Sequence, residues 1–292
     1  MKIVYFDHNV YIKCLDNTQL CEKIIKWRDE KEITVLYSPA HIEEVYRVAS
    51  DKNSIYRCKM LDLLNLFEII TQNKEAFPSE EGGVRIENEK PEVCYARCKS
   101  IDTRNRVEED SLKRFMIDTA HYKKMLSEDK QNRSISTLSA LDVWDNTVVK
   151  GLIDDWNNNK DDYILKYNNS IDIIMLKLIG LDRSLPMDFM FKENSFEERL
   201  KYSHKEIEFT IEFLMRVLNF CGYCAEKSEK TAISSTHDVS HCIYATVADS
   251  LVTMDERFAK KSKAVYTYLG VNTDVIYCRD LDAINTWIEQ KT

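Results

Sequence analysis

The sequence predicts an α/β fold built on a parallel sheet, and three observations support this prediction. Strand-like and helix-like segments alternate at the start of the chain, and the same alternation returns near its end. The strand-like segments are short apolar runs, which is typical of strands covered on both faces. Only six glycines and four prolines occur in 292 residues, 31% of which are charged, and this argues against an all-β fold.

The amino-terminal elements follow the order strand, helix, strand, helix. Strands are expected at 2–6, "KIVYF", and 33–37, "ITVLY", with a polar turn and then a helix over 18–31 between them. In "SPAHIEEVYRVAS", Ser38 is placed to cap the second helix and Pro39 fills its first position. Strands joined through helices pair in parallel, so this order predicts a parallel sheet.

The middle of the chain has a different pattern. Helical periodicity continues over 51–70 and ends where prolines and a glycine pair interrupt regular structure in "TQNKEAFPSEEGGVRIENEKPE". From 93 to 203 the pattern is helical but irregular. We therefore expect a discontinuous α/β domain formed by 1–70 and 205–292, with a mainly helical insertion over 71–204.

The α/β pattern resumes in the last third of the chain. Amphipathic helices are expected over 205–223 and 235–248. The remaining expected elements are a strand at 250–254, a helix at 255–269, a strand at 274–278 and a helix at 281–290. The sheet is thus predicted to form from both ends of the chain.

Composition limits the classes of partner. The net charge of −8 and the pI near 5.4 exclude a global positive field, so nucleic-acid binding would need a local basic patch. Asp7, His8 and Asn9 interrupt the first apolar run, which therefore fits a strand and not a signal peptide. No stretch approaches the roughly 20 apolar residues that span a bilayer. We expect a cytoplasmic protein with reduced cysteines and no membrane partner.

Acidic residues recur where a doubly wound sheet places its functional groups, at the carboxyl ends of strands. Asp7 follows the first strand and Asp255 follows the strand at 250–254. Glu44 lies in the helix after the second strand, and Asp238 is expected at the start of the helix that precedes the third. Carboxylates from separate segments are therefore expected to converge on one edge of the sheet.

A convergence of carboxylates needs a counter-charge, because like charges raise one another's pKa. Hard oxygen ligands without a His or Cys set at metal spacing favour Mg²⁺ or Mn²⁺, and these ions also bind phosphate oxygens. One or two such ions can activate a water and stabilise the departing oxygen of a phosphodiester. The sequence therefore predicts a Mg²⁺ or Mn²⁺ site.

Each acid alone also has a plain structural interpretation. Asp255 and Asp238 are of the type that caps helices, and Asp7 is of the type that forms turns. Glu44 alone fits a solvated helix position, and the adjacent Glu43 leaves the choice between the two open. Joint placement, and not any single residue, favours a site.

The sequence resembles the PIN-domain nucleases in three motifs. "VYFDHNVYI" matches a strand that ends in Asp followed by a polar residue and Asn. "SPAHIEEV" matches a helical Glu motif, and its register favours Glu44 because Val45 supplies the aliphatic residue. "HDVSHCIYATVADSLVTMDERF" reproduces an Asp that opens a helix and a strand exit of the form aliphatic-Thr-x-Asp-x-x-Phe. The motifs cover about residues 1–50 and 230–280, and the last is the most specific.

The resemblance implies a three-layer PIN-like fold and metal-dependent hydrolysis of RNA phosphodiesters. The implied catalytic metal ligands are Asp7, Glu44, Asp238 and Asp255. Asp249 would be a fifth ligand or a supporting acid, Thr253 would orient a carboxylate, and Asn9 would be a polar group of the site. The insertion has no counterpart in the compact members of the family, and we expect it to offer a surface for a protein partner or a second copy of the chain.

Two cysteine pairs offer a different metal site. Cys94 and Cys98 in "CYARC" could join Cys221 and Cys224 in "CGYC" to supply four zinc thiolates. The second pair, however, continues the apolar spacing of a helix, and the first is not a standard zinc knuckle. Buried apolar cysteines are therefore the favoured interpretation.

Histidines and basic residues flank the acids. His8, His237 and His241 could bind phosphate or shuttle protons, although a helix-surface or partly buried position is the favoured interpretation for His241. The candidate phosphate-binding residues are Lys260, Lys261 and Lys263 in "FAKKSKAVY", with a second basic group at Arg97, Lys99, Arg104 and Arg106. A solvated helix face explains both groups equally well.

The leading hypothesis is a Mg²⁺- or Mn²⁺-dependent endoribonuclease whose partner is nucleic acid, with RNA favoured over DNA. One alternative is a structure-specific DNA nuclease with the same metal chemistry. The other is a PIN-like module for binding or assembly that has no catalytic activity and no metal affinity at the acids. Metal titration separates the last hypothesis from the first two.

Overall fold

The fold is an α/β arrangement around a four-stranded parallel sheet. The structure is a computed structural model that describes residues 2–50, 55–79, 83–99, 135–151, 153, 204–224 and 229–291. The strands are β1 (Ile3–Phe6), β2 (Thr34–Leu36), β5 (Ser250–Thr253) and β6 (Asp274–Tyr277), in the order β2-β1-β5-β6. The central pair, β1 and β5, joins the two ends of the chain, with Tyr5 opposite Leu251. The predicted parallel sheet is confirmed.

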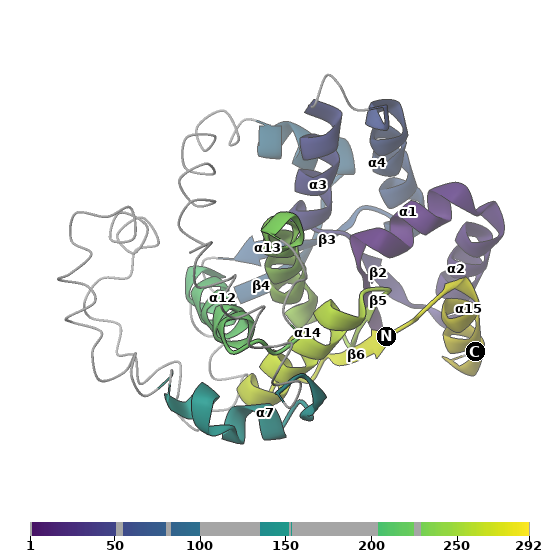
Figure 1. The fold of residues 1–292 in the computed structure, drawn as a ribbon. Helices are drawn as coiled ribbons and strands as arrows, with labels where there is room; N and C mark the ends of the chain where they lie inside the picture. The colour runs from purple at the N-terminus through teal and green to yellow at the C-terminus, as the bar shows by residue number, and fades with distance from the viewer. Residues whose placement is uncertain are drawn as a thin grey trace.

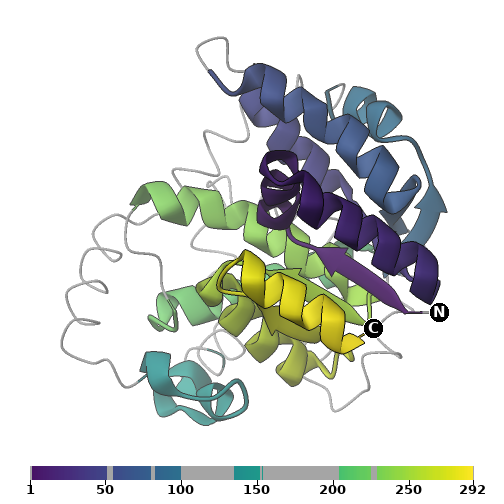
Figure 2. The same ribbon diagram turned by 90° about the vertical axis from the view of Figure 1, so that its right-hand side faces the viewer.

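Helices cover both faces of the sheet (Figures 1 and 2). One face carries α12 (His204–Phe220), α13 (Glu229–Tyr244) and α14 (Glu256–Leu269). The other face carries α1 (His8–Asp16), α2 (Thr18–Lys31), α3 (Pro39–Ser50), α4 (Arg57–Thr71) and α15 (Leu281–Lys291). The result is three layers, in which the sheet lies between two sets of helices.

The strands are apolar throughout because each contributes to two cores. Successive side chains on a strand point to opposite faces. Tyr5 and Leu251 pack with the α12–α14 face, whereas Val4, Phe6 and Val252 pack with the opposite face. This double burial is the reason that the strand sequences show continuous apolar runs instead of alternation.

A β-hairpin extends the edge of the sheet beside β2. It comprises β3 (Lys74–Ser79) and β4 (Gly83–Asn88), and a parallel bridge between Tyr37 and Glu75 joins it to β2. The prediction that regular structure is interrupted here is wrong. The same residue types also suit a hairpin, because Gly83 has a φ of 72° and Pro78 is tolerated in a strand outside the centre of a sheet.

The described part of 71–204 contains more than the hairpin. A helix covers 91–99, and short helical segments follow, η1 (Ile135–Thr137), α7 (Asp142–Asp145) and another that begins at 147. Residues 100–134 and 154–203, on which most of the expected helical insertion falls, lie outside the described residues. The division into a discontinuous α/β domain and an insertion stays a prediction.

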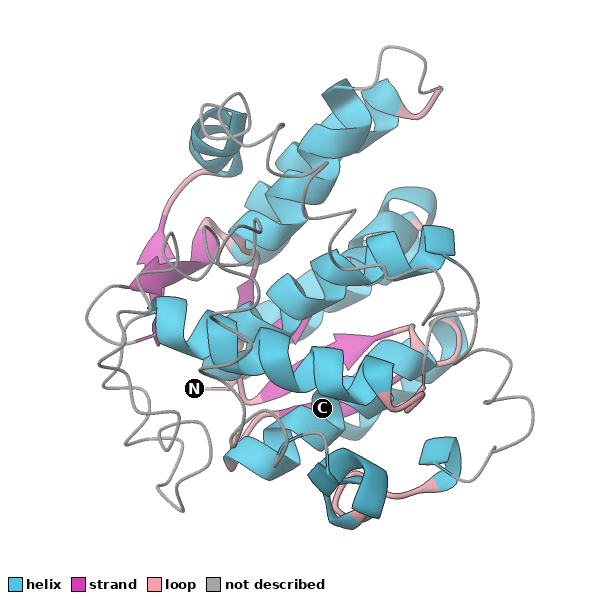
Figure 3. Cartoon of the chain, turned by 60° about the vertical axis from the view of Figure 1, so that its left-hand side comes forward, coloured by secondary structure: helices cyan, strands magenta, loops and turns pink. Residues whose placement is uncertain are grey.

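In Figures 1 and 2 the first and last parts of the chain lie on the same side of the molecule, and Figure 3 shows the strands of the sheet among the helices that cover them. Lys23 on α2 and Glu289 on α15 form an ion pair with 2.6 Å between Nζ and Oε1, which ties the last helix to the first part of the chain. None of the helices in the described ranges has both the length and the apolar character needed to cross a membrane.

Candidate metal centre at the carboxyl edge of the sheet

Asp7 is held at the carboxyl end of β1 by several hydrogen bonds. Its N–H donates to Val252 O (2.9 Å), and its Oδ1 accepts from the His8 N–H (2.7 Å). Its Oδ2 accepts from Thr253 Oγ1 (2.8 Å) and from Asn9 Nδ2 (3.3 Å). Asp7 therefore caps α1, a helix that begins where a polar turn was predicted, and it is also oriented by the neighbouring strand.

Asp255 follows β5 and caps α14. Its Oδ1 accepts from the Arg257 N–H (2.8 Å) and the Phe258 N–H (2.9 Å), so the capping interpretation is correct. The Asp255 N–H donates to Thr253 Oγ1 (3.0 Å), and the same hydroxyl donates to Asp7. Thr253 thus links the two acids that follow the central strands.

Glu44 on α3 faces the same edge, whereas Glu43 is exposed. Its Oε1 lies 2.8 Å from His241 Nε2, and that nitrogen is also 3.9 Å from Asp7 Oδ1. His241 is only 1% exposed, so the expected surface or partly buried position is wrong for this residue. His241 fills the space between two of the predicted metal ligands.

A hydrogen-bonded chain continues from His241 into the core. Tyr5 OH lies 2.7 Å from His241 Nδ1 and 2.6 Å from Ser38 Oγ. The Ser38 N–H donates to His41 Nδ1 (3.0 Å), and His41 Nε2 lies 2.8 Å from Phe6 O. Because a carbonyl can only accept, His41 carries its hydrogen on Nε2 and accepts at Nδ1. The orientation of Glu44 is therefore set through residues that the sequence identified only as strand and helix positions.

Asp238 approaches the cluster from inside α13, and not from the start of a helix as predicted. Because α13 begins at Glu229, Asp238 cannot cap it, and it shares a face with His241 three residues later. Burial raises the pKa of Asp238 to about 8, with Lys261 opposing and the charges of Asp7 and Asp255 adding to the increase. We call Asp7, Glu44, Asp238 and Asp255 the acidic edge.

Burial and neighbouring charges shift the pKa values of the acidic edge and of the histidines around it. Burial raises the pKa of Asp7, with Glu44 adding to this and His241 opposing it. Burial also acts to raise the pKa of Glu44, but His8 and the bonded His241 lower it well below its usual range. Burial lowers the pKa of His8, and lowers that of His237 to about 4.

Asp249 lies at the opposite edge of the sheet. It precedes β5, and its Oδ2 accepts a hydrogen bond of 2.7 Å from the Ile3 N–H at the amino end of β1. The full length of both central strands therefore separates it from the residues that follow them. The structure does not support Asp249 as a fifth ligand.

The three candidate lysines do not form one phosphate-binding face. Lys260 and Lys263 are exposed, and Lys260 pairs with Glu256 at 2.7 Å. Lys261 is only 1% exposed and donates to Asn219 Oδ1 (3.2 Å). Lys261 is therefore buried, where its charge acts on Asp238, while Lys260 and Lys263 face solvent.

The cysteine pairs do not form a four-thiolate site. Cys94 and Cys98 pack in the core on the α1–α4 face, whereas Cys221 and Cys224 pack in the core on the α12–α14 face. The sheet separates the two pairs. Cys94, Cys98 and Cys224 are buried, in agreement with their interpretation as apolar residues, whereas Cys221 is only partly buried.

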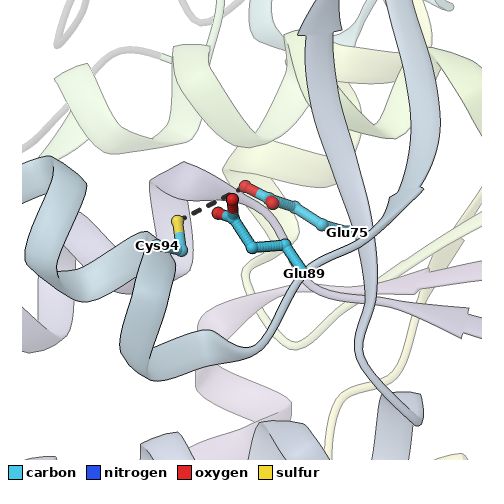
Figure 4. Close-up of side chains that lie close together, drawn as sticks. All are labelled: Glu75, Glu89 and Cys94. Atoms are coloured by element: carbon cyan, nitrogen blue, oxygen red, sulfur yellow. Dashed lines mark hydrogen bonds between the residues drawn. The ribbon is translucent and has the colours of Figure 1, made fainter.

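A second group of potential ligands lies beside the hairpin. Glu75 on β3, Glu89 after β4 and Cys94 on the 91–99 helix have one ligand atom each within 4.8 Å of one another (Figure 4). We call these three residues the Glu75 cluster. It is the one group within the described ranges that meets this distance, so the potential ligand atoms of the acidic edge lie farther apart than those of the Glu75 cluster. The Glu75 cluster could hold a metal ion.

Arg97 neutralises the Glu75 cluster. Its Nη2 lies 2.6 Å from Glu75 Oε1 and 2.8 Å from Glu89 Oε2. The sequence had offered Arg97 as a phosphate-binding residue, and this placement corrects that expectation, while Arg104 and Arg106 fall outside the described residues. The contacts depend on the hairpin, so no pattern along the chain could have revealed them.

Comparison with protein-family models, with curated proteins and with solved structures finds no match to this chain. The interpretation of the acidic edge therefore depends on its own geometry and on the short motifs that resemble the PIN-domain nucleases.

Proposed function

We propose that this protein is a PIN-like, divalent-metal-dependent nuclease that hydrolyses RNA phosphodiesters at the acidic edge. One observation carries the proposal: carboxylates from β1, α3, α13 and the end of β5 influence one another's ionisation at a single edge. Burial and the neighbouring carboxylates raise the pKa values of Asp7 and Asp238, and a bound divalent cation would reverse this by favouring the ionised forms. Carboxyl groups with shifted pKa values that gather at this edge of a parallel sheet are typical of a functional site.

The residues present fit Mg²⁺ or Mn²⁺. All four acids offer carboxylate oxygens, which these ions prefer, and both backbone hydrogen bonds by which Asp255 caps α14 use Oδ1. His8 Nδ1 is buried beside Asp7 without a hydrogen-bond partner in the described part of the chain, so this nitrogen could bond to a ligand. A bound ion would supply an activated water and stabilise charge on the phosphate. The residues that would hold it are Asp7, Glu44, Asp238 and Asp255.

The surrounding residues position these carboxylates. Thr253 and the His8 N–H fix both oxygens of Asp7, so that this carboxylate presents one orientation to a ligand. Tyr5 holds His241 at Nδ1, and His241 in turn holds Glu44 through Nε2. Such supporting contacts tune the geometry of ligands that they do not replace.

The test is to incubate the purified protein with labelled RNA and DNA pools, in Mn²⁺ or in chelator. Metal-dependent cleavage of RNA by the wild-type protein, lost in Asp7→Asn and Asp255→Asn, is expected. Cleavage of DNA alone would establish the structure-specific DNA nuclease instead. Undiminished cleavage by both variants in chelator would exclude the proposal.

A second candidate function is a binding or assembly module with a PIN-like fold. The observation that favours it is His241, which lies between Glu44 and Asp7 where a cation would otherwise balance them. If the imidazolium is the permanent counter-charge, the acidic edge has no affinity for Mn²⁺. The two functions are therefore distinguished by metal binding before any substrate is tested.

A further inference from the structure

The Glu75 cluster already surrounds one cationic atom. Arg97 Nη2 lies 2.6 Å from Glu75 Oε1, 2.8 Å from Glu89 Oε2 and 3.2 Å from Cys94 Sγ. A single nitrogen thus touches the three atoms that a metal ion would use as ligands. Figure 4 shows the two carboxylates turned toward each other, with the Cys94 sulfur beside them.

Arg97 satisfies this cluster incompletely. Glu75 is fully buried, and its Oε2 has no hydrogen-bond partner among the described residues. Glu89 Oε2 is close to Arg97 Nη2, but the alignment is not that of a hydrogen bond, and this atom is also buried. Unsatisfied acceptors next to a completely buried thiol are costly, and a ligand that bonds to several of them at once would relieve the cost.

We propose that Glu75, Glu89 and Cys94 bind one divalent transition-metal ion, with Zn²⁺ preferred, at the position of Arg97 Nη2. The ligand set decides the metal: two carboxylates and one thiolate suit Zn²⁺, whereas Mg²⁺ and Ca²⁺ prefer oxygen ligands alone. Binding forms a metal–sulfur bond, and the Cys94 thiol proton passes to the solvent. The charges then balance, because two carboxylates and a thiolate face the metal and the displaced guanidinium.

The side chain of Arg97 has room to move away from the three ligands. Its side chain is 29% exposed, and its guanidinium lies 4.6 Å from the centroid of the Phe77 ring. A rotation toward solvent would move the charge away from the ligands while it remains near the ring. The three ligands belong to β3, the residue after β4 and the 91–99 helix, so a bound ion would cross-link the hairpin to that helix.

The experiment is a titration of chelator-treated full-length protein with Co²⁺, followed by absorption spectroscopy. A bound thiolate gives Co²⁺ a sulfur-to-metal charge-transfer band that carboxylates cannot give, so the acidic edge does not interfere. All proteins carry Cys58→Ser, because Cys58 is the exposed thiol among the nine cysteines. We expect the band to saturate at one Co²⁺ per chain and to be abolished when Zn²⁺ displaces Co²⁺.

Matched variants test which residues bind the Co²⁺ ion. Cys94→Ser should lose the band, whereas Cys98→Ser, one helical turn away and also buried, should retain it. Asp7→Asn should retain it as well, which separates this inference from the proposed nuclease function. Arg97→Met should bind Co²⁺ about tenfold more tightly, because a charge-assisted hydrogen bond no longer competes.

Two results would overturn the proposal. One is the absence of a charge-transfer band both in the wild-type background and in Arg97→Met. These two proteins keep Cys94, so this result does not depend on whether Cys94→Ser folds. The other is a band that survives in a folded Cys94→Ser protein, because the thiolate ligand would then lie elsewhere.

Discussion

In the Glu75 cluster one arginine nitrogen contacts all three potential ligands, whereas at the acidic edge four carboxylates share a partly neutralising histidine and a buried lysine. The Glu75 cluster is compact, with its ligand atoms within 4.8 Å, and the acidic edge is more open. The difference is that one guanidinium contacts every member of the Glu75 cluster, whereas at the acidic edge His241 is bonded to Glu44 and lies farther from Asp7. We therefore propose that the acidic edge takes a cation from solution.

The largest expected effect is the loss of nuclease activity in Asp7→Asn. The substitution keeps the size of the side chain but removes a charge that helps to hold the metal, so cleavage should fall on the order of 1,000-fold. Initial rates of RNA cleavage in Mn²⁺ measure it. Asp249→Asn, at the opposite edge of the sheet, is the matched control and should retain activity. Equal losses in the two variants would contradict the assignment of Asp7.

The second effect concerns Arg97, the cationic side chain that contacts the Glu75 cluster. Arg97→Met leaves the carboxylates of Glu75 and Glu89 without their partner, and we expect the free energy of unfolding to fall by about 3 kcal/mol in chelator. Urea denaturation measures the change. Arg85→Met is the control, because Arg85 also lies near Phe77 but is itself exposed and pairs with the half-buried Glu87, so its loss should cost less than about 1 kcal/mol.

The third prediction is a pH dependence of stability in metal-free protein. Burial raises the pKa of Glu75 from 4.5 to about 7, with Glu89 adding to the increase and Arg97 and the Cys94 thiol opposing it. A carboxyl with a higher pKa in the folded state stabilises the protein while protonated, so this contribution should decline by about 2 kcal/mol from pH 5 to 7. Glu75→Gln cannot ionise and should remove this part of the slope. An unchanged slope in Glu75→Gln would assign the titration to another group.

The smallest effect is expected from the residue that links two acids. Thr253→Val removes the hydroxyl that donates to Asp7 and accepts from the Asp255 N–H, so nuclease activity should fall about tenfold. Thr267→Val is the control, because the Thr267 hydroxyl bonds only to Lys263 O on the surface of α14 in the described structure. A wild-type rate for Thr253→Val would show that the orientation of Asp7 does not depend on this contact.

Much of the sheet could be predicted from sequence because its signals are local. The apolar strands β1, β2, β5 and β6 and the α2 helix lie where the runs and the periodicity place them. The hairpin could not be predicted, because its glycine and proline residues give the same signal as an irregular loop. The early start of α1 was missed because Asp7 was interpreted as a turn former, although it caps the helix directly.

The acidic edge was predictable to the extent that its members follow strands. Asp7 and Asp255 lie directly after β1 and β5, so their convergence follows from the parallel topology. The role of His241 could not be predicted, because its bonds to Glu44 and Tyr5 connect residues about 200 positions or more apart. The Glu75 cluster was missed for the same reason, since the unpredicted hairpin brings its members together.

Calorimetric titration with Mn²⁺ tests the central claim most directly. Both proteins carry Cys94→Ser, which removes the thiolate of the Glu75 cluster. The Cys94→Ser protein should bind Mn²⁺, and adding Asp7→Asn should abolish that binding while the fold, checked by circular dichroism, is unchanged. This result would show that the acidic edge takes its cation from solution. The absence of Mn²⁺ binding in Cys94→Ser, or equal binding after Asp7→Asn is added, would contradict the claim.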